Sequence, residues 1–353
     1  MDRHAPSFRD ASTRRPPRRR RAGIALLGVL AFGAWPAAPC PASPARPAAQ
    51  AHEKPWRDAV VAALQARGDA HALATAALLA DGPLELDLAN RATALAPQDA
   101  AVAWVALRLC AQSPGCDLRG DATELRWLDP GNGAAWLPVI DSGMRDGDEV
   151  ETDRALAHMA KSNGFDFYWN RIVVMMVDAL AKAAGDVRAG PIDSDANRLA
   201  LAERIAAARV VPRLASLLEA CRGAKAGGAR HSACETVARL LEAGDTISAQ
   251  LTGIAIDQRY ARADGREFRS LGERRRVLEW RVETAAGFDK PLLPWLRNAH
   301  ARWRIARMRS LARQEDVIMA VLREHGMPLD PPPPPPPPTP PPAPPEPLHL
   351  KLP

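Results

Sequence analysis

Three tryptophans recur at nearly constant spacing through the first half of this chain. Trp104, Trp136 and Trp169 stand 32 and 33 residues apart, and Pro97 and Pro130 stand 33 apart just ahead of the first two. A period in the low thirties is typical of stacked helical hairpins, in which each unit buries its apolar face against the next. The chain is therefore expected to fold as a stack of helix pairs.

Apolar residues at helical spacing extend this interpretation along the first half. The predicted helices cover residues 56–66, 71–79, 86–94, 100–111, 118–128, 134–144 and 150–159. Segments that contain Pro, Gly or Asp separate them, because Pro lacks an amide donor and Asp accepts from the free amides at a helix start. Alanine is abundant and runs of β-branched residues are few, so the composition predicts an all-α fold.

The turn at 128–132 (LDPGN), followed by Ala-Trp-Leu at 135–137, resembles the boundary between two tetratricopeptide repeats. The segment 95–99 (LAPQD) with Trp104 is a poorer copy, and the copy at Trp169 has no proline. The resemblance covers residues 68–170 and implies a concave, peptide-binding face lined by the first helix of each pair. The whole chain is also similar to uncharacterised exported α-helical proteins of Gram-negative bacteria, a likeness that implies no function.

The second half keeps the helices but loses the period. The predicted helices cover residues 167–184, 197–208, 212–222, 232–243, 247–260, 266–283 and 291–323, the last with a break. The run at 172–177 is apolar on every side and predicts a central buried helix. The expected fold is thus a tetratricopeptide-like helical-hairpin solenoid, residues 52–185, that continues into a further helical region, residues 186–328.

The amino terminus has the composition of an export signal. Arg18 to Arg21 precede an apolar run at 22–34. That run of about 13 residues is shorter than the roughly 20 that a permanent membrane helix requires. Residues 1–51 are therefore assigned to an export signal and a Pro/Ala-rich spacer, which predicts a periplasmic protein. An inner-membrane protein anchored by an uncleaved signal is the alternative.

The net charge of +6 comes from this signal segment. Residues 1–52 hold nine Arg and two Asp, a surplus of seven positive charges, so the rest of the chain is close to −1. The basic pI is thus a property of the signal. It gives no support for a nucleic-acid partner.

Four cysteines follow the signal, as the pairs Cys110 with Cys116 and Cys221 with Cys234. In an oxidising compartment, two local disulfides are the expected state, although four cysteines allow three pairings. A metal site that uses His231 near Cys234 is the competing interpretation. Thiolate metal sites normally have a tighter Cys-x2–4-Cys spacing, so no metal is expected.

A basic segment near the end of the second half is a candidate partner surface. It has few acidic neighbours before Glu315, and a cluster of this kind favours an anionic partner, by peripheral membrane or glycan contact as well as by protein contact. Its arginines are Arg302, Arg304, Arg307, Arg309 and Arg313.

A search for catalytic motifs found none: the metalloprotease, serine-hydrolase, phosphate-loop and dinucleotide signatures are all missing. No catalytic residue and no cofactor are predicted. Helical enzymes of the envelope can work with one catalytic Glu, so an envelope hydrolase that uses Glu203, Glu219 or Glu235 remains an alternative, as does a structural protein that contacts glycan or lipid.

Eight consecutive prolines begin at Pro331 and open a proline-rich tail, residues 329–353. Fixed φ angles and missing amides predict an extended polyproline II rod, a frequent ligand of aromatic grooves. Taken together, these features predict an exported helical-repeat scaffold that binds another protein or a peptide in the cell envelope.

Overall fold

A computed structural model describes residues 46–187, 192–263, 265–288 and 293–333. The described part is all-α, with fifteen α-helices, one short 3-10 helix and no strand beyond a single bridge between Asn132 and Gly164. Consecutive helices pack as adjacent pairs, so the predicted fold class, a helical-hairpin arrangement that continues into a further helical region, is confirmed. The predicted export signal and all but the start of the proline-rich tail lie outside the described residues.

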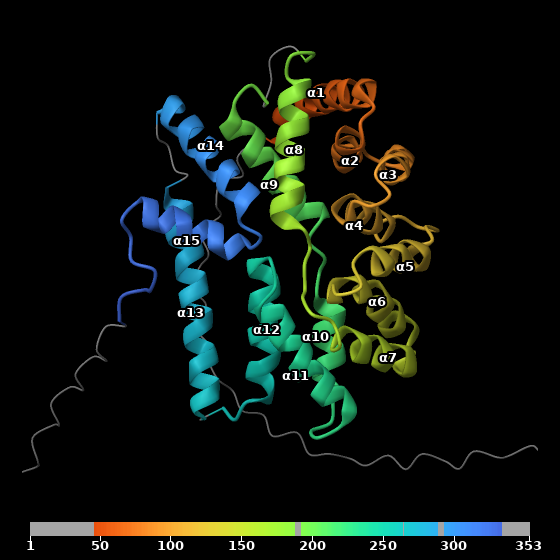
Figure 1. The fold of residues 1–353 in the computed structure, drawn as a ribbon, viewed down its shortest axis with the longest axis vertical. Coiled ribbons are helices and arrows are strands. Elements are labelled where there is room, and N and C mark those ends of the chain that lie inside the picture. The colour runs from red at the N-terminus through yellow and green to blue at the C-terminus, as the bar shows by residue number, and fades with distance from the viewer. Residues whose placement is uncertain (1–45, 188–191, 264, 289–292, 334–353) are drawn as a thin grey trace, which may run out of the picture. The chain divides into compact units, whose positions relative to one another are not determined.

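The first half consists of seven α-helices and the 3-10 helix η1 (Figure 1). Their bounds are α1 Arg46–Arg67, α2 Ala70–Leu79, α3 Pro83–Leu95, α4 Ala100–Cys110, α5 Leu118–Leu128, η1 Gly133–Trp136, α6 Leu137–Asp146 and α7 Glu149–Met159.

Aspartates begin four of these helices, because the turn before each of the four supplies one at the required position. Asp69, Asp99, Asp117 and Asp148 are the N-cap residues of α2, α4, α5 and α7, and each carboxylate accepts from an amide two or three residues further on. These bonds satisfy amides that have no partner within the helix. The helix boundaries are therefore encoded locally.

The described part of the second half consists of eight helices. They are α8 Trp169–Ala183, α9 Asp195–Arg209, α10 Ala215–Arg222, α11 Ala229–Glu242, α12 Ile247–Tyr260, α13 Arg266–Gly287, α14 Pro294–Ser310 and α15 Gln314–Glu324. The break expected within residues 291–323 lies between α14 and α15. Helix α8 is buried along most of its length, as its apolar run predicts.

The second half covers the side of the repeat hairpins that a tetratricopeptide array would leave open. Helix α8 packs on α2 and α4, α10 packs on α6, and α11 packs on α7. Several hydrogen bonds join the layers. Among them, Arg108 Nε donates to the carbonyl of Val210 (3.2 Å), and Gln112 Nε2 donates to that of Arg209 (3.0 Å). The first helices of the pairs therefore face the chain's own helices.

The composition of α2 explains most clearly why the second half packs against the repeat hairpins. All eight residues from Ala72 to Leu79 are buried, and a helix that is apolar all round is stable only when it is enclosed on every side. The guanidinium of Arg209, in α9, donates to the carbonyl of Ala80 (2.9 Å) at the end of α2 and pairs with the carboxylate of Glu85. The chain's own second half thus buries and hydrogen-bonds a face of α2 that an open solenoid would expose to solvent.

An irregular segment, residues 161–168, leads into α8, and its second half, from Phe165, crosses the interior. Asn132 holds it to the preceding turn: its Oδ1 accepts from the amides of Ala134 and Asp166, and its Nδ2 donates to the Tyr168 hydroxyl (2.9 Å). Tyr168 has a φ of 57°, a left-handed conformation that a residue other than glycine rarely adopts. Its hydroxyl donates to Asp129 (2.6 Å), so side-chain hydrogen bonds hold this strained residue in place.

Asp245 holds the other side of the same segment. It lies in the loop between α11 and α12, is almost fully buried, and accepts through its two oxygens from the amides of Phe167 and Trp169, each at 2.9 Å. Buried amides need such partners, because no water reaches them. The predicted helix at 167–184 consequently starts two residues later, at Trp169, since Phe167 and Tyr168 bond to side chains.

Candidate functional site

Trp104, in α4, lies in the core. Its side chain is 1% exposed and stacks on Phe167, with ring centroids 5.4 Å apart and planes inclined by 20°. Trp169, at the start of α8, is 5% exposed. Neither ring is therefore accessible to a partner protein at the molecular surface, and Trp104 is a packing residue.

Trp136, the third member, lies at the end of η1 and is only partly buried. Its ring stacks on the exposed imidazole of His158, from α7, at a centroid distance of 4.4 Å and an angle of 7°. The guanidinium of Arg126, from α5, lies 4.4 Å from the Trp136 ring centroid, a cation–π geometry. Three helical elements thus place one cation and two aromatic rings together at the molecular surface.

Trp127 follows Arg126 on α5, and its side chain is 71% exposed. We call the four residues Arg126, Trp127, Trp136 and His158 the aromatic edge. Sequence reasoning missed Trp127 because it falls outside the tryptophan period. A signal was present all the same, since an indole on the polar side of an amphipathic helix has no packing reason to be there.

Arg126 is the cation of the aromatic edge. Partial burial lowers the pKa of Arg126, whose Nη2 donates to the Thr123 hydroxyl (2.7 Å). Within the described ranges, Arg126 forms no ion pair with a carboxylate. Arg154 and Lys161 are exposed on α7 and just after it. An indole beside a partly dehydrated guanidinium is suited to an apolar or aromatic side chain with a carboxylate next to it.

The arginines of the basic segment hold α14 against its neighbours. Arg304 pairs with Glu203 of α9 (2.6 Å), Arg309 with Asp178 of α8 (2.5 Å), and Arg302 lies 3.6 Å from Asp195. The Arg307 guanidinium lies over the Trp303 ring, and Arg313 pairs with Glu315. Acids far away in the sequence therefore neutralise much of a cluster that looks unpaired along the chain, and its role as a partner surface stays a prediction.

Both expected disulfides are present. Cys110–Cys116 ties the end of α4 to the following loop, and Cys221–Cys234 joins α10 to α11. Closing the 13-residue interval of the second bond is worth on the order of 3 kcal/mol. Two disulfides suggest an oxidising location outside the cytoplasm. None of the helices in the described ranges has the length and apolarity that a membrane crossing needs.

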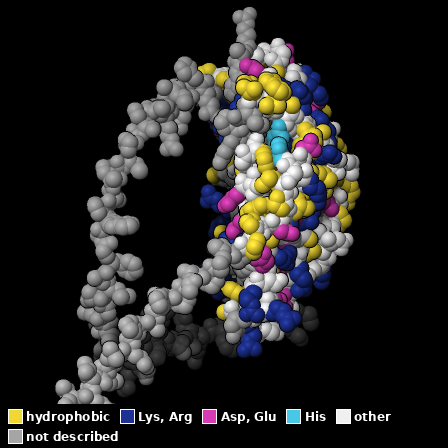
Figure 2. Space-filling model, turned by 90° about the vertical axis from the view of Figure 1, so that its left-hand side faces the viewer, with side chains coloured by type: hydrophobic (Ala, Val, Ile, Leu, Met, Phe, Trp, Pro, Cys, Tyr) yellow, Lys and Arg dark blue, Asp and Glu magenta, His cyan; other side chains and the backbone are white. Residues whose placement is uncertain are grey.

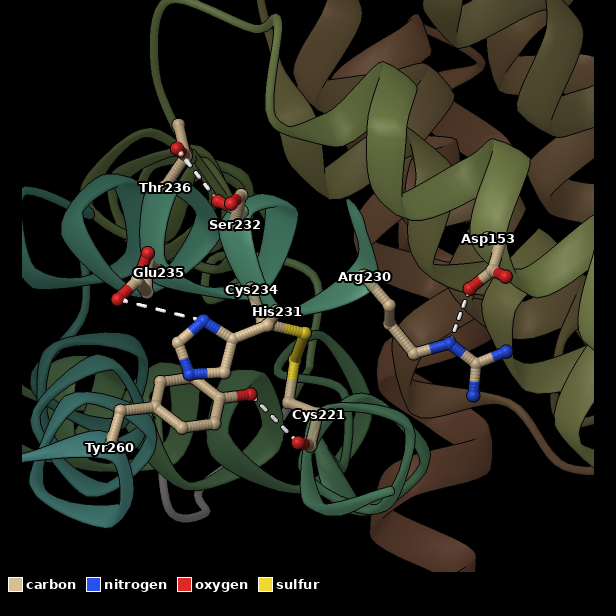
Figure 3. The surroundings of a disulfide bond; sticks show 9 residues. All are labelled: Asp153, Cys221, Arg230, His231, Ser232, Cys234, Glu235, Thr236 and Tyr260. Carbon is tan, nitrogen blue, oxygen red and sulfur yellow. Dashed lines mark hydrogen bonds and ion pairs between the residues drawn. A yellow bond between two sulfur atoms is a disulfide. The ribbon is translucent and has the colours of Figure 1, made fainter. Parts of the chain in front are cut away.

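The surroundings of Cys221–Cys234 are structural (Figure 3). His231 pairs with Glu235 (3.7 Å), one of the three glutamates considered as a lone catalytic acid, and its ring lies 4.2 Å from that of Tyr260. The Tyr260 hydroxyl donates to the Cys221 carbonyl (2.7 Å). Both sulfur atoms are used in the disulfide, so the alternative of a metal site at His231 and Cys234 is not supported by this arrangement.

The other two glutamates considered as a lone acid are also ion-paired. Glu203 pairs with Arg304, and Glu219 pairs with Arg222 on the surface of α10. Carboxyls with strongly raised pKa values lie elsewhere, and one of them is Asp257 in α12. Burial, followed by the nearby carboxylate of Glu242 in α11, raises the pKa of Asp257 to about 7.

Asp257 and Glu242 form a carboxyl pair where α11 and α12 cross at Gly253, whose position leaves no room for a Cβ. Glu242 Oε1 is buried without a hydrogen-bond partner in the described structure, and a proton carried by Asp257 would supply one. Glu242 also lines a cleft of about 530 Å³ beside α13, but Asp257 is not among the lining residues. The carboxyl of Asp257 therefore does not face the cleft, and this position favours a structural role for it.

Replacement of Asp257 by Asn is expected to change how stability depends on pH. In the native state its pKa is about 7, above the roughly 3.9 of an unfolded chain. The raised pKa of Asp257 therefore does not lower the free energy of unfolding near pH 4. The loss grows as the pH rises to 7 and is constant above that. Asn removes this cost, so Asp257→Asn should gain about 1 kcal/mol at pH 8, after allowance for solvent screening, and nothing at pH 4.

Urea denaturation at a series of pH values measures this effect, with Asp87→Asn on the exposed side of α3 as the matched control. The control should keep the wild-type pH dependence. A stability gain for Asp257→Asn of equal size at pH 4 and pH 8 would contradict the assignment.

Comparison with known proteins adds no relative. No protein-family model matches the chain, and no similar curated protein or solved structure was found.

Proposed function

We propose that this protein is a tetratricopeptide-like scaffold of the periplasm that binds a segment of another protein through the aromatic edge. The observation that carries the proposal is Trp127. An indole that is 71% exposed, next in the sequence to a cation held over a second indole, has the composition of a binding hot spot. Covering this indole with a partner would remove a large apolar area from water, which favours association.

The proposal places the partner on the outside of the repeat stack. The inner sides of α2, α4 and α6 are covered by α8 and α10, and Trp104 is enclosed by the chain itself. The exposed large apolar residues of the repeat region lie instead on the second helix of each pair, as Leu84 and Leu95 of α3, Trp127 of α5 and Val150 of α7. This distribution supports binding by the outer helices rather than by a concave groove.

The chemistry of the aromatic edge also limits the partner. The positive charge of Arg126, with Arg154 and Lys161 nearby, favours a segment that carries acidic residues next to an aromatic or aliphatic one. A peptide of that kind can place its apolar side chain on Trp127 and its carboxylate near the guanidinium. The periplasmic location rests on the two disulfides together with the export-type composition of residues 1–51.

Trp127→Ala is expected to abolish recovery of one specific partner from crosslinked native envelopes. The partner, once identified and purified, should bind the variant at least about 30-fold more weakly than wild type, because a central tryptophan is typically worth 2 kcal/mol or more at an interface. Titration by calorimetry gives both affinities. Urea midpoints of the two proteins should agree, since an exposed side chain contributes little to folding.

The matched control is Trp295→Ala, which removes the other strongly exposed tryptophan of the described residues, 64% accessible at the start of α14. It should leave partner affinity unchanged. Equal loss in both variants would point to non-specific apolar adhesion, and undiminished binding by Trp127→Ala would refute the aromatic edge as the site. Recovery of no protein by wild type would favour the hydrolase or glycan-binding alternative.

A further inference from the structure

A cavity of about 280 Å³ lies among five helices of the second half, α8, α9, α13, α14 and α15. In Figure 1, α13 to α15 stand on one side of α8 and α9. The face seen in Figure 2 shows hydrophobic side chains gathered along its middle, with histidine among them and basic side chains mostly toward the margins. None of the four residues of the aromatic edge lines this cavity.

One side of the cavity is apolar. Val282 and Ala285 of α13 and Val317, Ile318 and Val321 of α15 form this wall. None of these side chains can donate or accept a hydrogen bond. This wall is therefore suited to a hydrocarbon surface.

The cavity also has polar lining residues, which come mainly from the other three helices. Trp169 of α8, Glu203 of α9 and Arg304 of α14 line it, and the carboxylate of Glu203 lies 2.6 Å from the guanidinium of Arg304. A second hollow of about 180 Å³ shares Glu203 and Arg304 and adds Arg297, which has no ion pair in the part of the chain described here. Two arginines against one glutamate make this end of the paired hollows electropositive.

Trp169 supplies the group that points to a ligand. Its side chain is 95% buried (5% exposed), it lines the cavity, and its Nε1–H has no hydrogen-bond partner in the described structure. A buried donor without an acceptor is unfavourable. An acceptor atom held in the cavity would satisfy it.

We infer that this cavity binds a small amphiphilic carboxylate, with its hydrocarbon part against α13 and α15 and its carboxylate toward Trp169 and the two arginines. A water molecule occupies about 30 Å³ of liquid volume, so 280 Å³ accommodates roughly ten non-hydrogen atoms. Octanoate has that size and this polarity. The site is independent of the aromatic edge and goes beyond the scaffold function proposed above.

Calorimetric titration of the purified full chain with octanoate tests the inference. One site per chain is expected, with a Kd on the order of 10–100 μM, as is reasonable for a ligand of this size. Octylamine has the same chain and the opposite charge and should bind at least about tenfold more weakly. Equal binding of the two probes, or no octanoate binding at 1 mM, would overturn the inference.

Two variants locate the site. Trp169→Phe keeps an aromatic ring but removes the Nε1–H donor, so octanoate affinity should fall about five- to tenfold. Ala285→Leu places a larger side chain in the apolar part of the cavity and should abolish octanoate binding. Ala285 is partly exposed on α13, so the fold should tolerate the change. Thr284→Leu, the adjacent residue on α13, adds a similar side chain outside the cavity and should leave the affinity unchanged. Wild-type affinity in Ala285→Leu would place octanoate elsewhere and refute the assignment, whatever the folding of Trp169→Phe.

Discussion

Trp104→Ala is expected to lower the free energy of unfolding by about 3–5 kcal/mol, because it empties a fully enclosed site in the centre of the core. The indole is 1% exposed and stacks on Phe167. The loss combines the transfer free energy of the ring with the cost of the cavity that remains. The effect should be among the largest of any single substitution in this chain.

Urea unfolding followed by far-ultraviolet circular dichroism measures this loss. Trp127→Ala is the matched control, since it deletes the same side chain from an exposed position and should change the free energy of unfolding by less than about 0.5 kcal/mol. The two variants separate packing from binding within one repeat region. A destabilisation below 1 kcal/mol for Trp104→Ala would show that the second half does not enclose α4.

Asp245→Ala is expected to cost about 3 kcal/mol or more, because it removes the acceptors of two buried amides at once. The amides of Phe167 and Trp169 would be left without partners in the core, and each buried unsatisfied group costs roughly 1–3 kcal/mol. The crossing segment and the start of α8 should loosen together. The near-ultraviolet circular dichroism of Trp169 and Tyr168 should then weaken.

Asp245→Asn is the matched control for this prediction. Burial and the neighbouring Asp166 raise the pKa of Asp245, so a neutral side chain of the same shape fits the site. Asn keeps one acceptor oxygen and should cost clearly less than Ala. Hydrogen exchange can report the amides of Phe167 and Trp169 directly: unchanged protection in Asp245→Ala would contradict the role assigned to this carboxylate.

The helices and their boundaries could be predicted from the sequence because their causes are local. An N-cap aspartate such as Asp99 bonds to amides two and three residues away. The break between α14 and α15 and the pairing of Cys110 with Cys116 also depend on near neighbours in the chain. The tryptophan period predicted the helical hairpins, because successive helix pairs in a stack repeat the same packing contact.

The arrangement of the candidate sites could not be predicted in this way. Arg304 looks unpaired along the chain, yet its carboxylate partner Glu203 lies 101 residues earlier. Trp104 and Trp127 are the same type of residue in similar helices. The second half covers the side chain of Trp104, but no described part of the chain covers that of Trp127. The cavity beside Trp169 needs five helices to enclose it, and no local pattern encodes such an enclosure.

The sequence by itself thus determined an all-α chain of helix pairs with two local disulfides, because hydrogen bonds, caps and short loops act over a few residues. Only the tertiary structure decided that the second half fills the inner side of the repeats. That outcome depends on which apolar faces match in shape across more than a hundred residues, as when Arg209 of α9 reaches the end of α2. A helix face is buried only when a second face packs against it, and the sequence of the first helix does not show which part of the chain supplies that second face.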